Sequence, residues 1–394
     1  MDLRYSETDE KFRAEVREWL AVEVPAHGPP PPPGDMAARR VYDTAWQRKL
    51  HDAGYAGVAW PEEFGGRGLP VTQQLVYLEE YARAGAPYIS VNFVGIMHAG
   101  PTLIAEGTDE QRRRHLSGIL KGEEVWCQGF SEPGAGSDLA SLSTRAVRDG
   151  DEYVVTGQKI WSTRAHVADY CELLVRTDPT AAKHKGITWL ILDMDQPGVD
   201  VRPLRTIDGE SHFCEIFLDG ARVPVTDRVG EENDGWRVTN VTLRFERGTA
   251  FAQHVITLRA QLRNLVRLAR MPDAAGEVAW ESDAVRERIG TMHANVEALW
   301  RMTQMGIAEA ERTGLPASTG SALKLRYSEL TQEISELGMR LVGDAVLGRT
   351  PASGVETAEI VREYLWSLQY TIAAGTSQIQ RNLVAQRILG LPKR

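Results

Sequence analysis

A short apolar stretch runs into a glycine-rich turn at Trp126-Cys127-Gln128-Gly129-Phe130-Ser131-Glu132-Pro133-Gly134-Ala135-Gly136-Ser137-Asp138. Gly134 and Gly136 allow the backbone to approach a ligand closely, and the serines and the aspartate supply polar groups. No βαβ pattern surrounds the turn, so it is not the Gly-x-Gly-x-x-Gly fingerprint of dinucleotide-binding proteins. Taken alone, the segment fits a ligand-binding turn and also fits an ordinary turn at the end of a strand.

The sequence on either side of this turn divides into zones of different periodicity. Helical spacing prevails before it, several short segments rich in β-branched and aromatic residues follow it up to about Val229, and long helical patterns fill the rest. The sequence therefore predicts a mostly α-helical protein with a central β domain. The expected domains are an N-terminal helical domain (1–122), a middle β-barrel (123–230) and a C-terminal four-helix bundle (231–394).

Composition and charge exclude several classes of protein. The chain has 394 residues and a net charge of −9, without the basic face of a nucleic-acid binder. No apolar run approaches the roughly 20 residues that span a bilayer, and the polar N-terminus has no signal-peptide core. Cys127, Cys171 and Cys214 are isolated, which argues against a disulfide scaffold and a zinc site. We expect a cytoplasmic protein that binds no metal, nucleic acid or membrane.

Two further segments contain residue types suited to a cofactor. In Gly157-Gln158-Lys159-Ile160-Trp161-Ser162-Thr163, an aromatic residue precedes two hydroxyl residues at a predicted strand end. Trp161 could stack on a ring system, or it could anchor the core of the β domain. In Ala373-Ala374-Gly375-Thr376-Ser377-Gln378-Ile379-Gln380-Arg381-Asn382, Thr376 or Ser377 can cap a helix whose free amides suit a phosphate. A well-capped structural helix has the same pattern.

Together, and in this order, the three segments resemble the acyl-CoA dehydrogenase family. Matching stretches also occur at Trp60-Pro61, Phe64-Gly65-Gly66, Gly107-Thr108-Asp109-Glu110-Gln111 and Asp234-Gly235-Trp236, so the resemblance covers essentially the whole chain. It implies FAD bound between the domains and α,β-dehydrogenation of an acyl-CoA thioester to the trans-2-enoyl thioester. It also implies an electron-transfer flavoprotein as the electron acceptor.

The resemblance implies a role for each of a set of residues. Phe130 and Ser131 would lie along the flavin, Trp161 near the isoalloxazine and Thr163 near its N5 edge. The full cofactor-binding set is Gln128, Phe130, Ser131, Trp161, Ser162, Thr163, Thr376 and Gln378. The substrate-binding set is Ser137 at the pantetheine arm, Arg247 and Ala374. The floor of the acyl cavity would involve the segment Ile89–Gly100.

The chain departs from the family at the catalytic carboxylate. Many members have it just before the Gly-Thr of the third segment, where this chain has Ala374. A second arrangement in the family places it on the first long helix of the bundle, at the position of Glu246. Arg244 and Arg247 beside Glu246 are typical of a solvated face, whereas the residues three and four positions away are uncharged. We expect Glu246 to be the base and the backbone amide at Ala374 to stabilise the thioester oxygen.

Two inter-subunit motifs of the family are missing. The Arg-x-x-Phe stretch is replaced by Ala269–Gly276, and the Gly-Gly-x-Gly turn by Val342-Gly343-Asp344-Ala345. Apolar residues on more than one face of the segment Leu323–Leu341 predict an oligomer, with a homotetramer or homodimer preferred over a mixed tetramer. Two alternatives stay open, which are flavin-dependent oxygenation of a small natural product and a non-catalytic subunit of a mixed complex.

Overall fold

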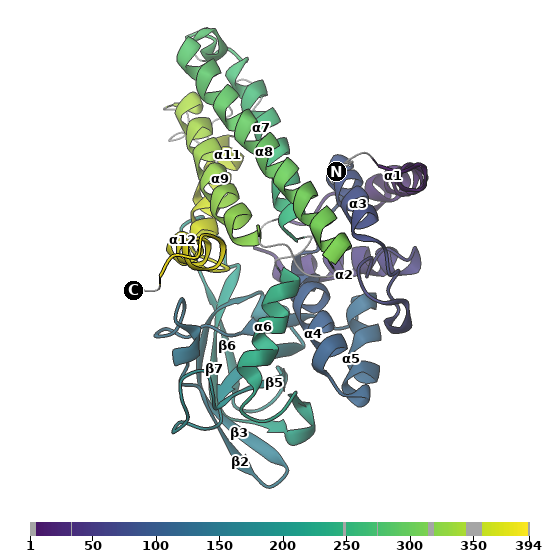
Figure 1. Ribbon diagram of the computed structural model, residues 1–394, viewed down its shortest axis with the longest axis vertical. Coiled ribbons are helices and arrows are strands. Elements are labelled where there is room, and N and C mark those ends of the chain that lie inside the picture. Colours follow the sequence, from purple (N-terminus) through teal and green to yellow (C-terminus); the bar gives the residue numbers. More distant parts are fainter. Residues whose placement is uncertain are drawn as a thin grey trace. The chain divides into compact units, whose positions relative to one another are not determined.

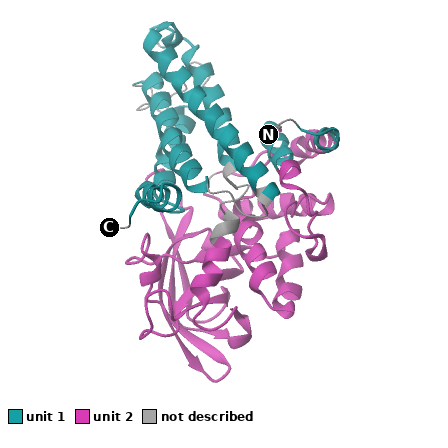
Figure 2. Ribbon diagram, in the orientation of Figure 1, with its two compact units in different colours: residues 1–14, 75–83, 247–394 teal, residues 15–74, 84–246 magenta. Residues whose placement is uncertain are grey.

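The computed structural model describes residues 5–32, 34–246, 250–273, 275–313, 319–343 and 357–392 (Figure 1). The chain forms two compact units, which Figure 2 distinguishes by colour. Unit 1 comprises residues 1–14, 75–83 and 247–394, and unit 2 comprises residues 15–74 and 84–246. Helices α1 (Glu7–His27) and α3 (Val71–Arg83) each contribute residues to both units.

The helical part of unit 2 is built from short amphipathic elements with well-defined ends. Besides part of α1, it contains α2 (Met36–Asp52), the π-helical turn η3 (Gly95–Ala99), α4 (Gly100–Glu106) and α5 (Asp109–Lys121). Thr108 and Gln111 form a reciprocal capping box at the start of α5, and Gly122 ends that helix in the left-handed conformation. These caps satisfy backbone groups that the helix itself leaves unpaired.

The middle of the chain forms one eight-stranded mixed sheet. The strands along its main path follow the order β6-β7-β3-β2-β4-β5-β8, and β1 pairs with β4 in parallel. Their bounds are β1 (Trp126–Gly129), β2 (Arg145–Asp149), β3 (Glu152–Thr163), β4 (Tyr170–Arg176), β5 (Ile187–Asp193), β6 (Val199–Leu204), β7 (Phe213–Pro224) and β8 (Arg228–Val229). Strands β2 and β3 form the hairpin that Asp149-Gly150 predicted.

Nearly all residues of strands β4 and β5 are buried. Since successive side chains point to opposite sides of the sheet, both faces of these strands are covered. On one side, Leu173 and Val175 belong to a core formed within the β domain. On the other side, Leu174 and Trp189 belong to a core shared with the helical residue Leu120 and others of α4 and α5. The two cores hold the helices and the sheet of unit 2 together.

Helix α6 (Gly235–Glu246) begins against strand β5 of unit 2. A Cβ at Gly235 would come within 2.6 Å of the backbone of Thr188, so only glycine permits this close approach. Further along the helix, the buried hydroxyl of Thr242 lies 2.8 Å from that of Thr102 on α4. These contacts fix the helix that ends at Glu246.

Unit 1 contains the C-terminal helices, packed around a single described apolar core that includes Leu258, Trp300 and Leu330. The helices are α7 (Ala250–Ala269), α8 (Asp283–Thr313), α9 (Gly320–Val342), α11 (Thr357–Ser367) and α12 (Ser377–Leu383), followed by the π-helical turn η9 (Val384–Ile388). The long helical patterns expected after Val229 begin with α6 and α7, and residues 247–249 between these two helices lie outside the described part. The predicted fold class, helical at both ends around a central β domain, is confirmed.

Short 3-10 turns connect several of these elements. They are η1 (Glu62–Phe64), η2 (Ser90–Asn92), η4 (Leu139–Ser141), η5 (Ala165–Val167), η6 (Val225–Asp227), η7 (Ala279–Glu281) and η8 (Leu368–Thr371). Among the described residues, no helix has the length and apolar character needed to cross a membrane. No three His, Cys, Asp or Glu side chains in the same part of the chain are grouped as metal ligands would be.

Candidate active site

A buried ion pair lies beneath the glycine-rich turn. Lys159 on β3 is 0% exposed, and its ammonium lies 2.8 Å from the Glu132 carboxylate. Glu132 also accepts hydrogen bonds from the backbone amides of Ser143 and Thr144, at 2.7 and 2.8 Å. Lys159 donates a second hydrogen bond, of 3.2 Å, to the carbonyl of Phe130. The pair therefore ties together the start of the turn, the segment that follows it and strand β3.

Both members of this pair have shifted pKa values. Burial alone would raise the pKa of Glu132, but the charge of Lys159 and the hydrogen bonds from Thr144 and Ser143 lower it to about 2. Burial lowers the pKa of Lys159, and the charge of Glu132 opposes that shift. The carboxylate consequently stays ionised at neutral pH, where it can accept all of these hydrogen bonds.

Gln128 on β1, predicted to bind the cofactor, belongs to a cluster of polar side chains. Its side-chain amide lies 2.7 Å from an oxygen of Glu172 and 3.1 Å from Nδ1 of His98. The same Nδ1 lies 3.2 Å from the Glu172 carboxylate, and both residues are buried. The sequence analysis missed His98 and Glu172, although a glutamate in the middle of an apolar strand was a signal.

Phe130 and Ser131 are held by backbone contacts with β3. The ring of Phe130 is buried in the core shared by the sheet and the helices. The carbonyl of Ser131 accepts a 3.0 Å hydrogen bond from the amide of Ile160. Ser137, further along the turn, is exposed. The ends of β1 and β3 therefore lie side by side and carry most of the predicted cofactor-binding residues.

Trp161 lies at an irregularity in the pairing of β3 with β7. Lys159 pairs with Ile216 and Ser162 with Cys214, so two residues of β3 stand opposite one of β7, as in a β-bulge. The backbone of Trp161 has a φ of 62°, and its indole is 57% exposed. The interpretation of Trp161 as a core residue of the β domain is thus wrong, because the bulge turns its ring outward.

Ser162 is buried between the more exposed Trp161 and Thr163. Its side chain is 0% exposed, and within the described residues its Oγ has no hydrogen-bond partner. Buried polar atoms are nearly always paired, so this hydroxyl is an exception, and it points away from the exposed indole of Trp161. Thr163 follows it, half-buried and paired with Phe213. An exposed indole followed two residues later by a partly exposed hydroxyl residue fits the ring and the edge of the flavin of FAD.

The third predicted segment lies in unit 1. Thr376 caps α12, its hydroxyl accepting a 3.2 Å hydrogen bond from the amide of Ile379. Gln378 is exposed in the first turn of that helix. Ala374 is also exposed and has a φ of 52°, and its carbonyl accepts a 3.0 Å hydrogen bond from Gln380. An alanine held in the left-handed region costs about 1–2 kcal/mol, which is often associated with a functional constraint.

The predicted base lies at the edge of the described chain. Glu246 is the last residue of α6, and its side chain, like the whole of Arg247, lies outside the described residues. The structure thus gathers six predicted residues at the ends of β1 and β3 in unit 2, and three in the segment before and within α12 in unit 1. The six are Gln128, Phe130, Ser131, Trp161, Ser162 and Thr163; the three are Ala374, Thr376 and Gln378.

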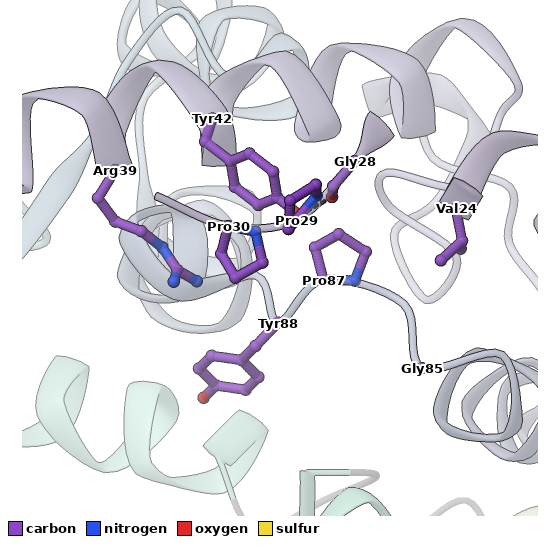
Figure 3. A pocket seen from close by; sticks show the side chains of 9 residues that line it. All are labelled: Val24, Gly28, Pro29, Pro30, Arg39, Tyr42, Gly85, Pro87 and Tyr88. Carbon is purple, nitrogen blue, oxygen red and sulfur yellow. Dashed lines mark hydrogen bonds between the residues drawn. The ribbon is translucent and has the colours of Figure 1, made fainter. Parts of the chain in front are cut away.

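Unit 2 contains a cavity of about 280 Å³ beside the proline-rich loop that follows α1. Figure 3 shows the prolines of this cavity between Tyr42 and Tyr88, with the guanidinium of Arg39 on one side. A second, more open hollow of about 580 Å³ is lined by Trp19 and Tyr55, among others. Neither is lined by a residue predicted to bind the cofactor.

The whole chain matches known proteins. Family models for the N-terminal, middle and C-terminal domains of acyl-CoA dehydrogenase match residues 6–123, 127–221 and 233–389. The acyl-CoA dehydrogenase IpdE1 of Mycobacterium tuberculosis is 40% identical over 392 residues, covering 98% of both chains.

Two solved structures show the same fold over 100% of both chains compared. A protein described as the Tcur3481-Tcur3483 steroid ACAD has a TM-score of 0.82 and 32% identity. The ChsE4-ChsE5 complex from Mycobacterium tuberculosis has a TM-score of 0.81 and 33% identity. Matches of this extent show more than a shared domain. The chain therefore belongs to the acyl-CoA dehydrogenase family, whose members are FAD-dependent oxidoreductases acting on acyl-CoA.

Proposed function

We propose that this chain converts an acyl-CoA thioester to its trans-2-enoyl-CoA with Glu246 as the base. The observation that carries the proposal is the exposed indole of Trp161 at the β3 bulge, with the partly exposed Thr163 two residues further along the strand. Such a surface suits a planar cofactor that needs both stacking and hydrogen bonds. When bound, FAD supplies the hydride acceptor for the β-carbon of the substrate.

Each residue of the chain has a separate task in this proposal. Glu246 removes the α-proton of the thioester, acting as general base. The backbone amide at Ala374 donates a hydrogen bond to the thioester oxygen as negative charge develops on it. Phe130 and Ser131 present a stretch of backbone that Lys159 and Ile160 hold in place. Ser137, exposed on the glycine-rich turn, contacts the pantetheine arm.

We propose a bulky acyl group, derived from a steroid, as the first substrate class to test. A solved relative 32% identical to this chain is described as a steroid ACAD. The acyl groups of a ring-bearing thioester and a straight-chain thioester differ greatly in volume, although the reacting α- and β-carbons are the same. A panel containing both therefore tests the acyl group separately from the chemistry.

We propose a mixed assembly with a related chain in preference to the homotetramer expected from the sequence. Each of the two matched solved structures names a pair of chains, and the Arg-x-x-Phe stretch is missing from this chain. Unit 1 also exposes Ile372, Leu389 and Leu391 near its C-terminal end, at 67%, 64% and 53%. Exposed apolar side chains of this size are typical of a surface that another chain covers. Reduced flavin would pass its electrons to an electron-transfer flavoprotein.

Anaerobic mixing with a panel of acyl-CoA thioesters tests the proposed reaction. Loss of the oxidised flavin absorbance, with the matching enoyl-CoA as product, is the expected result. Flavin that stays oxidised with every thioester, together with oxygenation of a small amine or natural product when chemically reduced flavin and O2 are supplied, contradicts dehydrogenation and favours the oxygenase alternative. A chain that binds no FAD, alone or with a partner, favours a non-catalytic subunit.

A further inference from the structure

Arg164 is a partly buried cation without a carboxylate partner among the described residues. It directly follows Thr163 and has left-handed backbone angles, with φ 55° and ψ 27°. Its guanidinium Nη1 lies 3.6 Å from the thioether sulfur of Met36, which is a weak acceptor. Burial, and then the charge of Arg39, lowers the pKa of Arg164. A guanidinium in this setting has strong hydrogen-bond donors that the described chain does not use.

The carboxylate that acts on Arg164 in the described part of the chain is that of Asp43, which serves other groups. Asp43 accepts two hydrogen bonds from Nε of Arg39, at 2.9 and 3.0 Å, and a third of 3.3 Å from the amide of Val91. Asp43 therefore neutralises Arg39. His166, two residues after Arg164, has a pKa lowered by burial and by the charge of Arg164, so it is neutral at neutral pH. The positive charge of Arg164 remains uncompensated.

Unused polar atoms also occur in turn η2, whose residues bond to Asp43. Ser90 is buried, has a φ of 37°, and its hydroxyl lacks a partner in the described part of the chain. Asn92 is also buried and donates a 3.1 Å hydrogen bond to the carbonyl of Asp43, while its own side-chain oxygen is unpartnered there. Both residues belong to the segment expected to form the floor of the acyl cavity.

Space for a ligand group lies on the same side of unit 2. Arg39, whose charge acts on Arg164, lines the cavity of about 280 Å³ shown in Figure 3, together with Tyr88. The surroundings of Arg164 thus combine a cation, unused polar atoms and an adjoining cavity. All of these groups belong to unit 2.

We propose that Arg164 recognises an oxygen acceptor, a carboxylate or a ring ketone, on the acyl group of the substrate. The proposal rests on the dehydrogenase function above, because it places Arg164 next to the predicted flavin edge at Thr163. A guanidinium binds a carboxylate through two parallel hydrogen bonds, and a carbonyl through one. Such a ligand offsets the cost of a partly buried cation whose neighbouring carboxylate, Asp43, is hydrogen-bonded to Arg39.

The test compares matched acyl-CoA substrates in three variants. The substrates share chain length and carry a hydrocarbon end, a carboxylate end or a keto-ring end. Arg164→Asn removes the charge and suits the left-handed backbone, because asparagine tolerates that conformation. Arg164→Lys keeps the charge but loses the planar fork. Arg113→Asn is the control, since Arg113 is 73% exposed and bonded to Glu110 on the surface of α5.

Arg164→Asn is expected to lower kcat/KM about 10- to 100-fold for one oxygen-bearing substrate, the range for a hydrogen bond to a charged group. It should change the value less than about threefold for the hydrocarbon substrate. Arg164→Lys should recover part of the rate only if the recognised group is a carboxylate. The oxygen-bearing substrate whose kcat/KM falls shows whether Arg164 recognises a carboxylate or a ring ketone. Arg113→Asn should behave as wild type.

An equal loss on all substrates, or no loss on any, overturns the proposal. Failure of the dehydrogenase function gives a different result, since then no thioester reduces the wild-type flavin. In that case calorimetric binding of the same three thioesters still tests Arg164. Equal affinities of wild type and Arg164→Asn for the oxygenated and hydrocarbon thioesters overturn the inference on their own.

Discussion

Glu246 decides whether the proposed chemistry can begin. Glu246→Gln keeps the shape of the side chain but cannot accept the α-proton, so flavin reduction by an acyl-CoA should fall at least about a hundredfold. FAD content should stay unchanged. Stopped-flow absorbance under anaerobic conditions measures the rate, with Glu231→Gln on an 87% exposed side chain as the control. If an acyl-CoA reduces the flavin of Glu246→Gln at a near-normal rate, Glu246 is not the base.

Trp161 tests the cofactor site without disturbing the core. Because its indole is exposed at the β3 bulge, Trp161→Ala should change folding stability by less than about 1 kcal/mol. The same variant should weaken FAD binding and shift the visible spectrum, since a stacked aromatic contact is lost. Trp161→Phe should keep most of both properties. If Trp161→Ala has the same visible spectrum and FAD content as wild type, Trp161 does not contact the cofactor.

At the scale of elements, the buried pair under the glycine-rich turn should dominate local stability. Lys159→Met leaves the Glu132 carboxylate buried without its cation, which costs about 3–5 kcal/mol. Lys183→Met is the matched control, because Lys183 bonds to Asp138 on the same turn but both side chains are substantially exposed. Exposed pairs contribute about 0–1 kcal/mol. Urea unfolding measures the loss of unfolding free energy in each variant. Equal losses would contradict the prediction that the buried pair contributes more to stability than the exposed pair.

The same pair predicts how stability depends on pH. The pKa of Glu132 is about 2 in the folded chain, below its ordinary value of 4.5, so the contribution of its carboxylate to stability is complete above about pH 4.5. That contribution is lost as the pH falls toward 2, when the carboxylate gains a proton. Glu132→Gln should therefore flatten the acid side of a plot of unfolding free energy against pH. A slope identical to that of wild type would show that other carboxyl groups govern acid stability.

Periodicity along the chain was enough to predict the order of helical, β and helical zones. It also located the ends of β1 and β3, where apolar strands give way to polar and glycine residues. It did not reveal that Lys159 pairs with Glu132 or that Gln128 meets His98 and Glu172. Those contacts depend on strand register and on loops that return over many residues. The bulge that exposes Trp161 likewise comes from pairing with β7, which a local pattern does not encode.

At the scale of the whole molecule, the proposed assembly predicts the state of the chain expressed alone. If a related chain completes the cofactor site, this chain by itself should bind little FAD and should elute as a smaller species in light scattering. Co-expression with a related acyl-CoA dehydrogenase chain from the same source should yield a larger yellow complex. A chain that purifies alone as a tetramer with one FAD per subunit would instead support the homotetramer.

The left-handed backbone at Ala374 has an evolutionary consequence. The cost of that conformation arises because Cβ approaches the following carbonyl, and alanine already bears it in full. Replacing alanine by glutamate there adds little further backbone strain, and the exposed side chain has room to lengthen. A lineage could therefore gain or lose a carboxylate at this position while keeping a folded protein at every step. A change in the location of the base within the family therefore does not require passing through an unfolded protein.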